Sequence, residues 1–297
     1  PPDTLATLLA YDDARASPMT DAPYSGYVRI EAGPSLLVAD VGAGPDVWSS
    51  AEAGAAPLSF EFSSARQRLI VNCGNTGGTS AIPADLAKAL RTTAAHSTLT
   101  LGDSNSTAIH ADGTLGAGVG SVEVDREELE GGSKIDASHD GYARRFGLIH
   151  QRTLALSASG RELRGEDALL PAPKRRKAAT APFAIRFHLA PHVEVTPTAD
   201  GQAALQSRDG GVALFDHDFG GFFEQWIAVV DVLGFHWDAC WPFQHAVEVR
   251  CRGGKLSIED SLWVDADGRP HPTQQFVIEG EAPPGGTSVA WLLKRAG

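Results

Sequence analysis

The segment 138–152, SHDGYARRFGLIHQR, gathers several residues that can exchange protons. His139 and Tyr142 flank Gly141, and glycine permits a turn with positive φ that brings two such neighbours to the same rim. A tyrosine and a histidine can act together as acid and base when burial and neighbouring charges adjust their pKa values. We therefore take His139 and Tyr142 as candidate catalytic residues. The alternative is an Asp-Gly turn in which Tyr142 packs on a sheet.

A second set of residues suits a metal ion. His96 begins an expected strand over 96–101, Asp112 follows in a turn, and His150 lies on a later strand, separations that suit neighbouring antiparallel strands. Two imidazoles and a carboxylate leave one position on a zinc ion open for water or substrate. The three residues are candidate zinc ligands, although histidines in a sheet also serve as hydrogen-bonded structural residues.

Candidate ligand-binding residues come from two further regions. In the strand expected over 149–156, alternation places His150, Arg152 and Leu154 on one face, which makes that face polar. Arg152 and the nearby Arg144 are candidates for binding an acidic ligand. The region 213–245 is dense in aromatic residues, and Trp226 and Trp237 could stack on sugar rings. The alternative for these aromatics is a satellite core or an interface with a missing partner domain.

The elements that must position these residues are mostly strands. Thirty-two glycines and eighteen prolines separate runs rich in Val, Leu, Ile, Thr and Phe, which is typical of many strands joined by turns. The run 24–40 predicts a hairpin about Gly33 and Pro34, and further strands are expected over 58–62, 68–72, 119–130, 161–170, 182–195 and 247–293. Only 83–91 and part of 213–245 have helical periodicity. The fold expected is an all-β, mostly antiparallel β-sandwich with one or two short helices.

Composition limits the partners. A net charge of −12 opposes binding to nucleic acid or to an anionic membrane, because both partners attract an excess of Lys and Arg. No apolar run is long enough for a transmembrane helix, and three cysteines cannot all pair within one chain. The chain starts with Pro1 rather than Met, so we expect a processed or partial piece whose N-terminus does not decide between a periplasmic and a cytoplasmic location.

Several blocks together resemble the C-terminal β domain of the heparinase II/III family of polysaccharide lyases, in its proteobacterial branch. These blocks are NCG, TTAAHSTLTL, SHDGYARRFGLIHQR, RELRGEDALL and PFAIRFHLAPHVEV. The resemblance implies a bacterial protein in which an α/α toroid precedes a β-sandwich and acidic glycans are cleaved by β-elimination. It also implies a zinc ion held by His96, Asp112 and His150. Ala94 and Ala95 stand where family members carry a further histidine, and the aromatic segment 213–245 looks like an insertion.

The sequence therefore predicts one β-sandwich domain over 1–297 that forms one wall of a glycan cleft and is inactive alone. The partners expected are an acidic polysaccharide such as a glycosaminoglycan and the toroid, which this chain does not contain; a homo-oligomer stays open. The alternative function is that of a non-catalytic carbohydrate-binding or assembly module.

Overall fold

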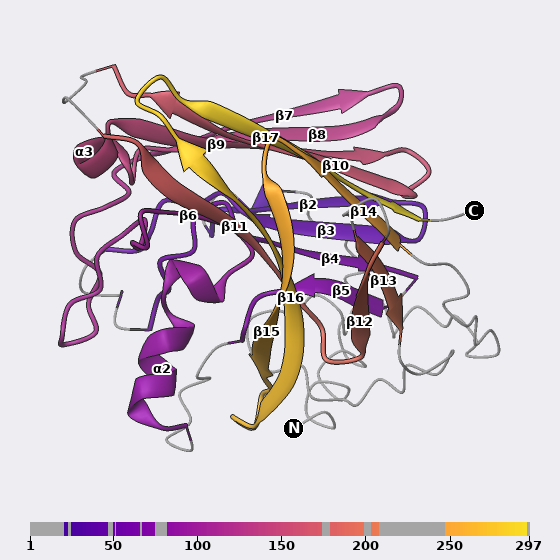
Figure 1. Ribbon diagram of the computed structural model, residues 1–297, viewed down its shortest axis with the longest axis horizontal. Coiled ribbons are helices and arrows are strands. Elements are labelled where there is room, and N and C mark those ends of the chain that lie inside the picture. The colour runs from indigo at the N-terminus through magenta and orange to yellow at the C-terminus, as the bar shows by residue number, and fades with distance from the viewer. Residues whose placement is uncertain are drawn as a thin grey trace, which may run out of the picture.

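Two antiparallel sheets face each other in the computed structural model of this chain (Figure 1). The structure describes residues 21–22, 25–46, 50, 52–65, 67–74, 82–173, 179–198, 203–207 and 247–295. Within these ranges the architecture is the all-β sandwich predicted from the sequence. The aromatic segment 213–245, with Trp226 and Trp237, lies outside the described residues.

The first sheet has nine strands among the described residues, in the order β1-β2-β3-β4-β5-β11-β16-β15, with β6 also paired to β11. Their bounds are β1 (Asp21–Ala22), β2 (Tyr27–Ala32), β3 (Ser35–Asp40), β4 (Phe60–Ser64), β5 (Gln67–Val71), β6 (Leu99–Leu101), β11 (Ala181–Leu189), β15 (Lys255–Val264) and β16 (Pro270–Ala282). The β2–β3 hairpin confirms the turn predicted from the sequence, in which Gly33 adopts a φ of 52°.

The second sheet has eight described strands in the order β12-β13-β14-β17-β10-β9-β8-β7. Their bounds are β7 (Val122–Leu129), β8 (Gly132–His139), β9 (Leu148–Ser157), β10 (Glu162–Pro171), β12 (Val193–Pro197), β13 (Ala203–Ser207), β14 (Val247–Arg252) and β17 (Thr287–Arg295). Every side chain at an even-numbered position of β9 is buried, because these positions point at the facing sheet.

The helices described are short. α2 (Ala84–Leu90) confirms the helix predicted over 83–91, and Pro83 stands immediately before it. α3 (Ala143–Phe146) links β8 to β9 and ends at Gly147, whose φ of 67° is accessible to glycine without strain. A single 3₁₀ turn, η2 (Thr93–Ala95), precedes β6. No helix within the described ranges is long and apolar enough to cross a membrane.

Aromatic side chains join the two sheets at the centre of the core. Phe60 of β4 stacks on Trp291 of β17 with ring centroids 5.6 Å apart, so this contact crosses between the layers. Phe187 of β11 stacks on Phe276 of β16 at 4.4 Å and meets Trp291 edge-on at 4.9 Å. All four rings are buried, and aromatic pairs of this geometry add to the free energy gained from burial alone.

One expectation about an individual residue is wrong. His96 does not begin a strand: it follows η2, and the strand starts at Leu99 because 96–98 are held by turn hydrogen bonds. The face of β9 that carries His150 and Arg152 is polar as expected, and it points into the sandwich interior. Charged and titratable groups in an apolar interior require partners, and these define the candidate site.

Candidate functional site

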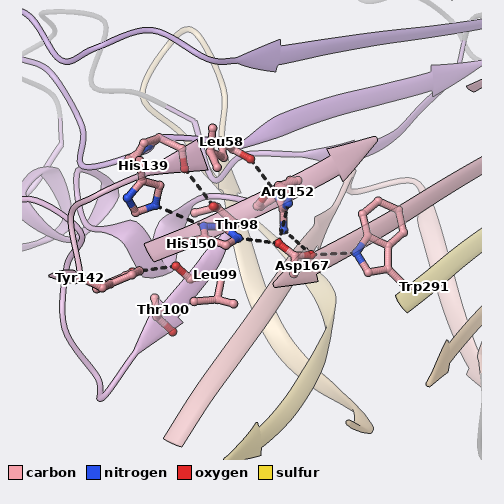
Figure 2. A network of polar contacts seen from close by, with 12 residues as sticks. Leu58, Thr98, Leu99, Thr100, His139, Tyr142, His150, Arg152, Asp167 and Trp291 are labelled. Atoms are coloured by element: carbon pink, nitrogen blue, oxygen red, sulfur yellow. Dashed lines mark hydrogen bonds and ion pairs between the residues drawn. The ribbon is translucent and has the colours of Figure 1, made fainter. Parts of the chain in front are cut away.

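A polar network lies on the inward face of the eight-stranded sheet, at the level where β8, β9, β10 and β17 run side by side (Figure 2). The strand register brings the members together. His139 of β8 is the direct cross-strand partner of His150 on β9, and Arg152 on β9 is the direct partner of Asp167 on β10. Trp291 reaches the same point from β17. The network is therefore built by sheet pairing and not by a loop.

Asp167 is the centre of the network, and its carboxylate accepts hydrogen bonds from three side chains. Its Oδ1 accepts from His150 Nε2 at 2.7 Å and from Arg152 Nε at 2.8 Å. Its Oδ2 accepts from Trp291 Nε1 at 2.8 Å and from Arg152 Nη2 at 3.1 Å (Figure 2). Four donors, two of them on the Arg152 guanidinium, replace the water that this buried carboxylate has lost.

Arg152 also connects this sheet to the facing layer. Its Nη1 donates to the backbone carbonyl oxygens of Leu58 and Ser97, each at 2.8 Å, and these residues precede β4 and β6 of the nine-stranded sheet. Only 1% of Arg152 is exposed. The guanidinium therefore forms an ion pair with Asp167 on its own sheet and donates hydrogen bonds to the backbone beside the facing sheet. We call Arg152 a structural tie because these contacts link the two sheets across the apolar core.

The two histidines form a directional chain of hydrogen bonds toward Asp167. The backbone amide of Gly141 donates to His139 Nδ1 at 3.1 Å, so the neutral ring of His139 carries its proton on Nε2. His139 Nε2 then donates to His150 Nδ1 at 3.2 Å, which leaves the proton of His150 on Nε2, where it donates to Asp167. Each nitrogen of the two rings thus has a defined partner.

The charges in this network are set by burial and by one ion pair. Burial lowers the pKa of His139 well below its usual value, and the neighbouring His150 and Arg152 lower it further. Burial also lowers the pKa of His150, although the bond to Asp167 opposes the shift. For Asp167 burial alone raises the pKa, but Arg152 and His150 outweigh it and hold the pKa far below its usual range. The network holds one carboxylate, one guanidinium and two neutral imidazoles.

Tyr142 packs beside the network without joining its hydrogen bonds. Its ring centroid lies 5.4 Å from that of His139, and its hydroxyl donates to the Leu99 carbonyl oxygen at 2.7 Å (Figure 2). Only 1% of Tyr142 is exposed, and burial raises the pKa of its hydroxyl. The structure thus brings the predicted pair together, but in the interior, where each of the two residues is only 1% exposed. This arrangement matches the alternative considered for the sequence, a turn with Tyr142 packed on the sheet.

The three predicted zinc ligands are not brought together. Both ring nitrogens of His150 are engaged, His96 Nδ1 contacts the Thr92 carbonyl oxygen at 2.8 Å, and Asp112 lies in an exposed turn where it accepts from Thr114. Within the described part of the chain, no group of three His, Cys, Asp or Glu side chains could hold a metal ion. These residues, as arranged here, do not fit a zinc site. Zinc binding stays a prediction that metal analysis of the purified protein would test.

The candidate ligand-binding residues Arg144 and Arg152 lie in different environments. Arg144 is exposed on α3, whereas Arg152 is buried and committed to Asp167. Sequence reasoning missed Asp167 and Trp291. The signal for Asp167 was its inward position in the alternating strand β10, between Gly165 and Leu169, since an ionisable residue at such a position needs a partner.

A second buried polar cluster on the nine-stranded sheet was also missed. His188 of β11 contacts the Ser261 hydroxyl through Nδ1 at 2.8 Å and the Ala94 carbonyl oxygen through Nε2 at 3.0 Å. Cys73 Sγ lies 3.3 Å from the same Nδ1. Burial lowers the pKa of His188 to about 3 and raises that of the Cys73 thiol to about 11, so neither the thiolate nor the imidazolium forms near neutral pH.

Comparison with known families assigns this architecture. The family described as "Heparinase II/III-like, C-terminal" matches residues 14–292. The chain belongs to this family. A curated relative, FtsZ-localized protein C of Caulobacter vibrioides (strain NA1000 / CB15N), is 36% identical over 225 residues, which are 69% of this chain and 36% of the relative. The chain thus spans about a third of that protein.

Solved structures agree on the fold of this heparinase II/III-like domain. The crystal structure of heparinase III superposes with a TM-score of 0.60 at 14% identity, over 92% of this chain and 36% of that one. The heparan sulfate lyase HepC from Pedobacter heparinus gives a TM-score of 0.63 at 12% identity, over 99% of this chain and 41% of that one. At such low identities the likeness concerns the fold alone.

Proposed function

We propose that this heparinase II/III-like domain is the C-terminal β domain of a bacterial polysaccharide lyase that cleaves uronate-containing acidic glycans by β-elimination. It forms one wall of the cleft, next to an N-terminal α/α toroid of the parent protein, and is inactive alone. Family membership supports the enzyme class, and two solved relatives bear the names of a heparinase and a heparan sulfate lyase.

One observation supports the proposal that the domain is inactive alone: the candidate acid and base, His139 and Tyr142, are buried between the two sheets. β-Elimination requires a base at the proton next to the uronate carboxylate, an acid at the leaving oxygen and donors that neutralise the carboxylate. His139, Tyr142 and Arg152 are each 1% exposed and hydrogen-bonded to protein groups. These side chains support the wall, and we infer that the reacting groups come from another part of the parent protein.

We infer from the family resemblance, which assigns a role to His96, that the adjoining η2 turn faces the cleft. His96 occupies the position that the family resemblance assigns to the first metal ligand, and the preceding Ala94 is exposed. The Ala94 side chain has no group that transfers protons, so this surface can contact a glycan without taking part in the chemistry. A non-catalytic wall of the cleft requires such a surface, which contacts the glycan but transfers no proton.

Activity of the isolated chain and of its parent protein tests the proposal. With heparan sulfate or alginate as substrate, the parent is expected to generate the ultraviolet absorbance of an unsaturated uronate, and chain 1–297 is not. Tyr142→Phe in the parent is expected to leave the rate within a few-fold, because only the bond to the Leu99 carbonyl oxygen is lost. A drop of 10²-fold or more would instead make Tyr142 a proton-transfer residue and contradict the proposal.

A second candidate function rests on the curated relative. Its name states localisation with FtsZ, and its 36% identity to this chain exceeds the 12–14% of the lyases compared above. We propose as the alternative that the domain is a non-catalytic assembly module in a protein of the division site. A fluorescent fusion of the parent protein that forms a ring with FtsZ, together with no lyase activity of the parent, would favour it; diffuse fluorescence would dismiss it.

A further inference from the structure

We propose that a groove on the outer face of the eight-stranded sheet binds a neutral sugar unit. The groove lies where β9, β10 and β17 run side by side, on the face opposite to the buried network. The register aligns Gln151, Ala168 and Ser288 as successive cross-strand partners, and it places Thr153 opposite Glu166 in the next row. Three strands therefore present the polar side chains of Gln151, Thr153, Glu166 and Ser288 around Ala168.

The groove is large enough for a sugar ring and has free polar groups. Its volume is about 450 Å³, within the range of sites for small ligands. Four lining side chains, those of Gln151, Glu166, Thr287 and Ser288, have no hydrogen-bonding partner among the described residues, whereas Thr153 donates to Asp136. An amide, a carboxylate and two hydroxyls together offer both donors and acceptors, the complement of a ring bearing several hydroxyl groups.

Charge indicates a neutral ligand. Among the described residues that line the groove, Glu166 carries the only charge. A uronate carboxylate would lie beside another carboxylate with no lining cation to neutralise it. A neutral unit such as an N-acetylhexosamine can donate its hydroxyls to Glu166 and bond its amide to Gln151. The groove therefore selects against the acidic sugars expected in the cleft, and this inference does not require lyase activity.

Apolar atoms complete one side of the groove. Leu170 is 42% exposed, and Ala168 lies beside it on the same strand face. These side chains suit the C–H face of a pyranose or an acetyl methyl group. The turn at Gly285 and Gly286 forms the adjoining rim, where a Cβ on Gly285 would meet open space, so this rim leaves the entrance clear.

Titration of isotope-labelled chain 1–297 with triacetylchitotriose, followed by backbone amide NMR, tests the site. A trisaccharide of alginate serves as the acidic probe. The double variant Gln151→Ala/Glu166→Gln is expected to weaken binding of the neutral probe at least about tenfold, because it removes the amide of Gln151 and replaces the charged acceptor of Glu166 by a neutral one. Glu123→Gln is the matched control, since Glu123 is exposed on the edge strand β7 of the same sheet. Ser288→Phe fills the groove at an exposed position and keeps the test decisive if the double variant is unstable.

The expected result is saturable shifts of amides at 151–153, 166–168 and 287–288 with the neutral probe, lost in the double variant or in Ser288→Phe and kept in Glu123→Gln. Three results would overturn the inference: no saturable shifts, shifts that map to other residues, or binding of the acidic probe as tight as that of the neutral one. Because no activity is measured, failure of this test leaves the proposed enzyme class untouched.

Discussion

Replacing Arg152 by Met should destabilise the domain strongly while keeping its aliphatic packing. The guanidinium makes four hydrogen bonds, two to Asp167 and one each to the Leu58 and Ser97 carbonyl oxygens. Removing one member of a buried ion pair costs about 3–5 kcal/mol, because the other charge stays buried. Two carbonyls also lose their donor. We therefore expect the free energy of unfolding to fall by about 4 kcal/mol, a large share of the roughly 5–15 kcal/mol of a typical domain.

Urea denaturation followed by tryptophan fluorescence measures this loss. Arg164→Met is the matched control: its side chain is 70% exposed and pairs with Glu162 on the surface, so about 0.5 kcal/mol or less is expected. The double variant Arg152→Met/Asp167→Asn should lose less than the sum of the two single variants, since it leaves no uncompensated charge. A loss below about 1 kcal/mol for Arg152→Met would refute the assignment of Arg152 as a structural tie.

Three further predictions concern Asp40, Gly165 and Cys73. Burial raises the pKa of Asp40 to about 7, so the contribution of Asp40 to stability is present below its unfolded pKa of about 4 and is lost as the pH rises through 7. The urea midpoint of Asp40→Asn, measured relative to that of the unsubstituted chain, should therefore increase from pH 5 to pH 8. A difference that stays constant with pH would contradict this. Gly165→Ala places a Cβ 2.0 Å from Trp291 Cζ2, so we expect a loss of about 2 kcal/mol and a changed tryptophan band in near-ultraviolet circular dichroism, whereas an unchanged band would argue against the packing. The third prediction uses a variant in which Cys240 and Cys251 are replaced by Ser, so that Cys73 is the one remaining thiol. Cys73 should react with a disulfide reagent at pH 8 only after unfolding, because burial raises the pKa of its thiol to about 11. Rapid reaction of the native protein would be inconsistent with that burial.

The strands of this fold were predictable because alternation and turn residues are local signals. The run 149–156 alternates so regularly that its residues divide into two faces on the sequence alone, and the β2–β3 hairpin follows from Gly33 and Pro34. Sequence alone could not decide which face pointed inward, because a histidine and an arginine are expected at a surface. Burial of that face depends on Asp167, which is a neighbour only through the pairing of β9 with β10.

Local sequence signals also identified several members of the candidate site, but not the roles of their side chains. His139 and Tyr142 are predicted as a catalytic pair and His150 as a ligand of a separate metal site, whereas the turn at Gly141 and the β8–β9 register bring all three together. Their role could not be read from spacing, because it depends on contacts with distant segments. Tyr142 bonds the Leu99 carbonyl oxygen, and Arg152 bonds residues that precede β4 and β6. Such contacts arise only when the two sheets pack.

The central claim is that His139 and His150 are neutral structural residues of the sandwich interior. Nitrogen NMR of the imidazoles in chain 1–297 tests it most directly. We predict that His139 and His150 both carry their proton on Nε2, become protonated only at a pH below the usual pKa of histidine, and do not shift when a uronate oligosaccharide is added. Protonation of either ring near its usual pKa, or a shift on adding the glycan, would show that the pair reaches solvent and substrate and would contradict the account.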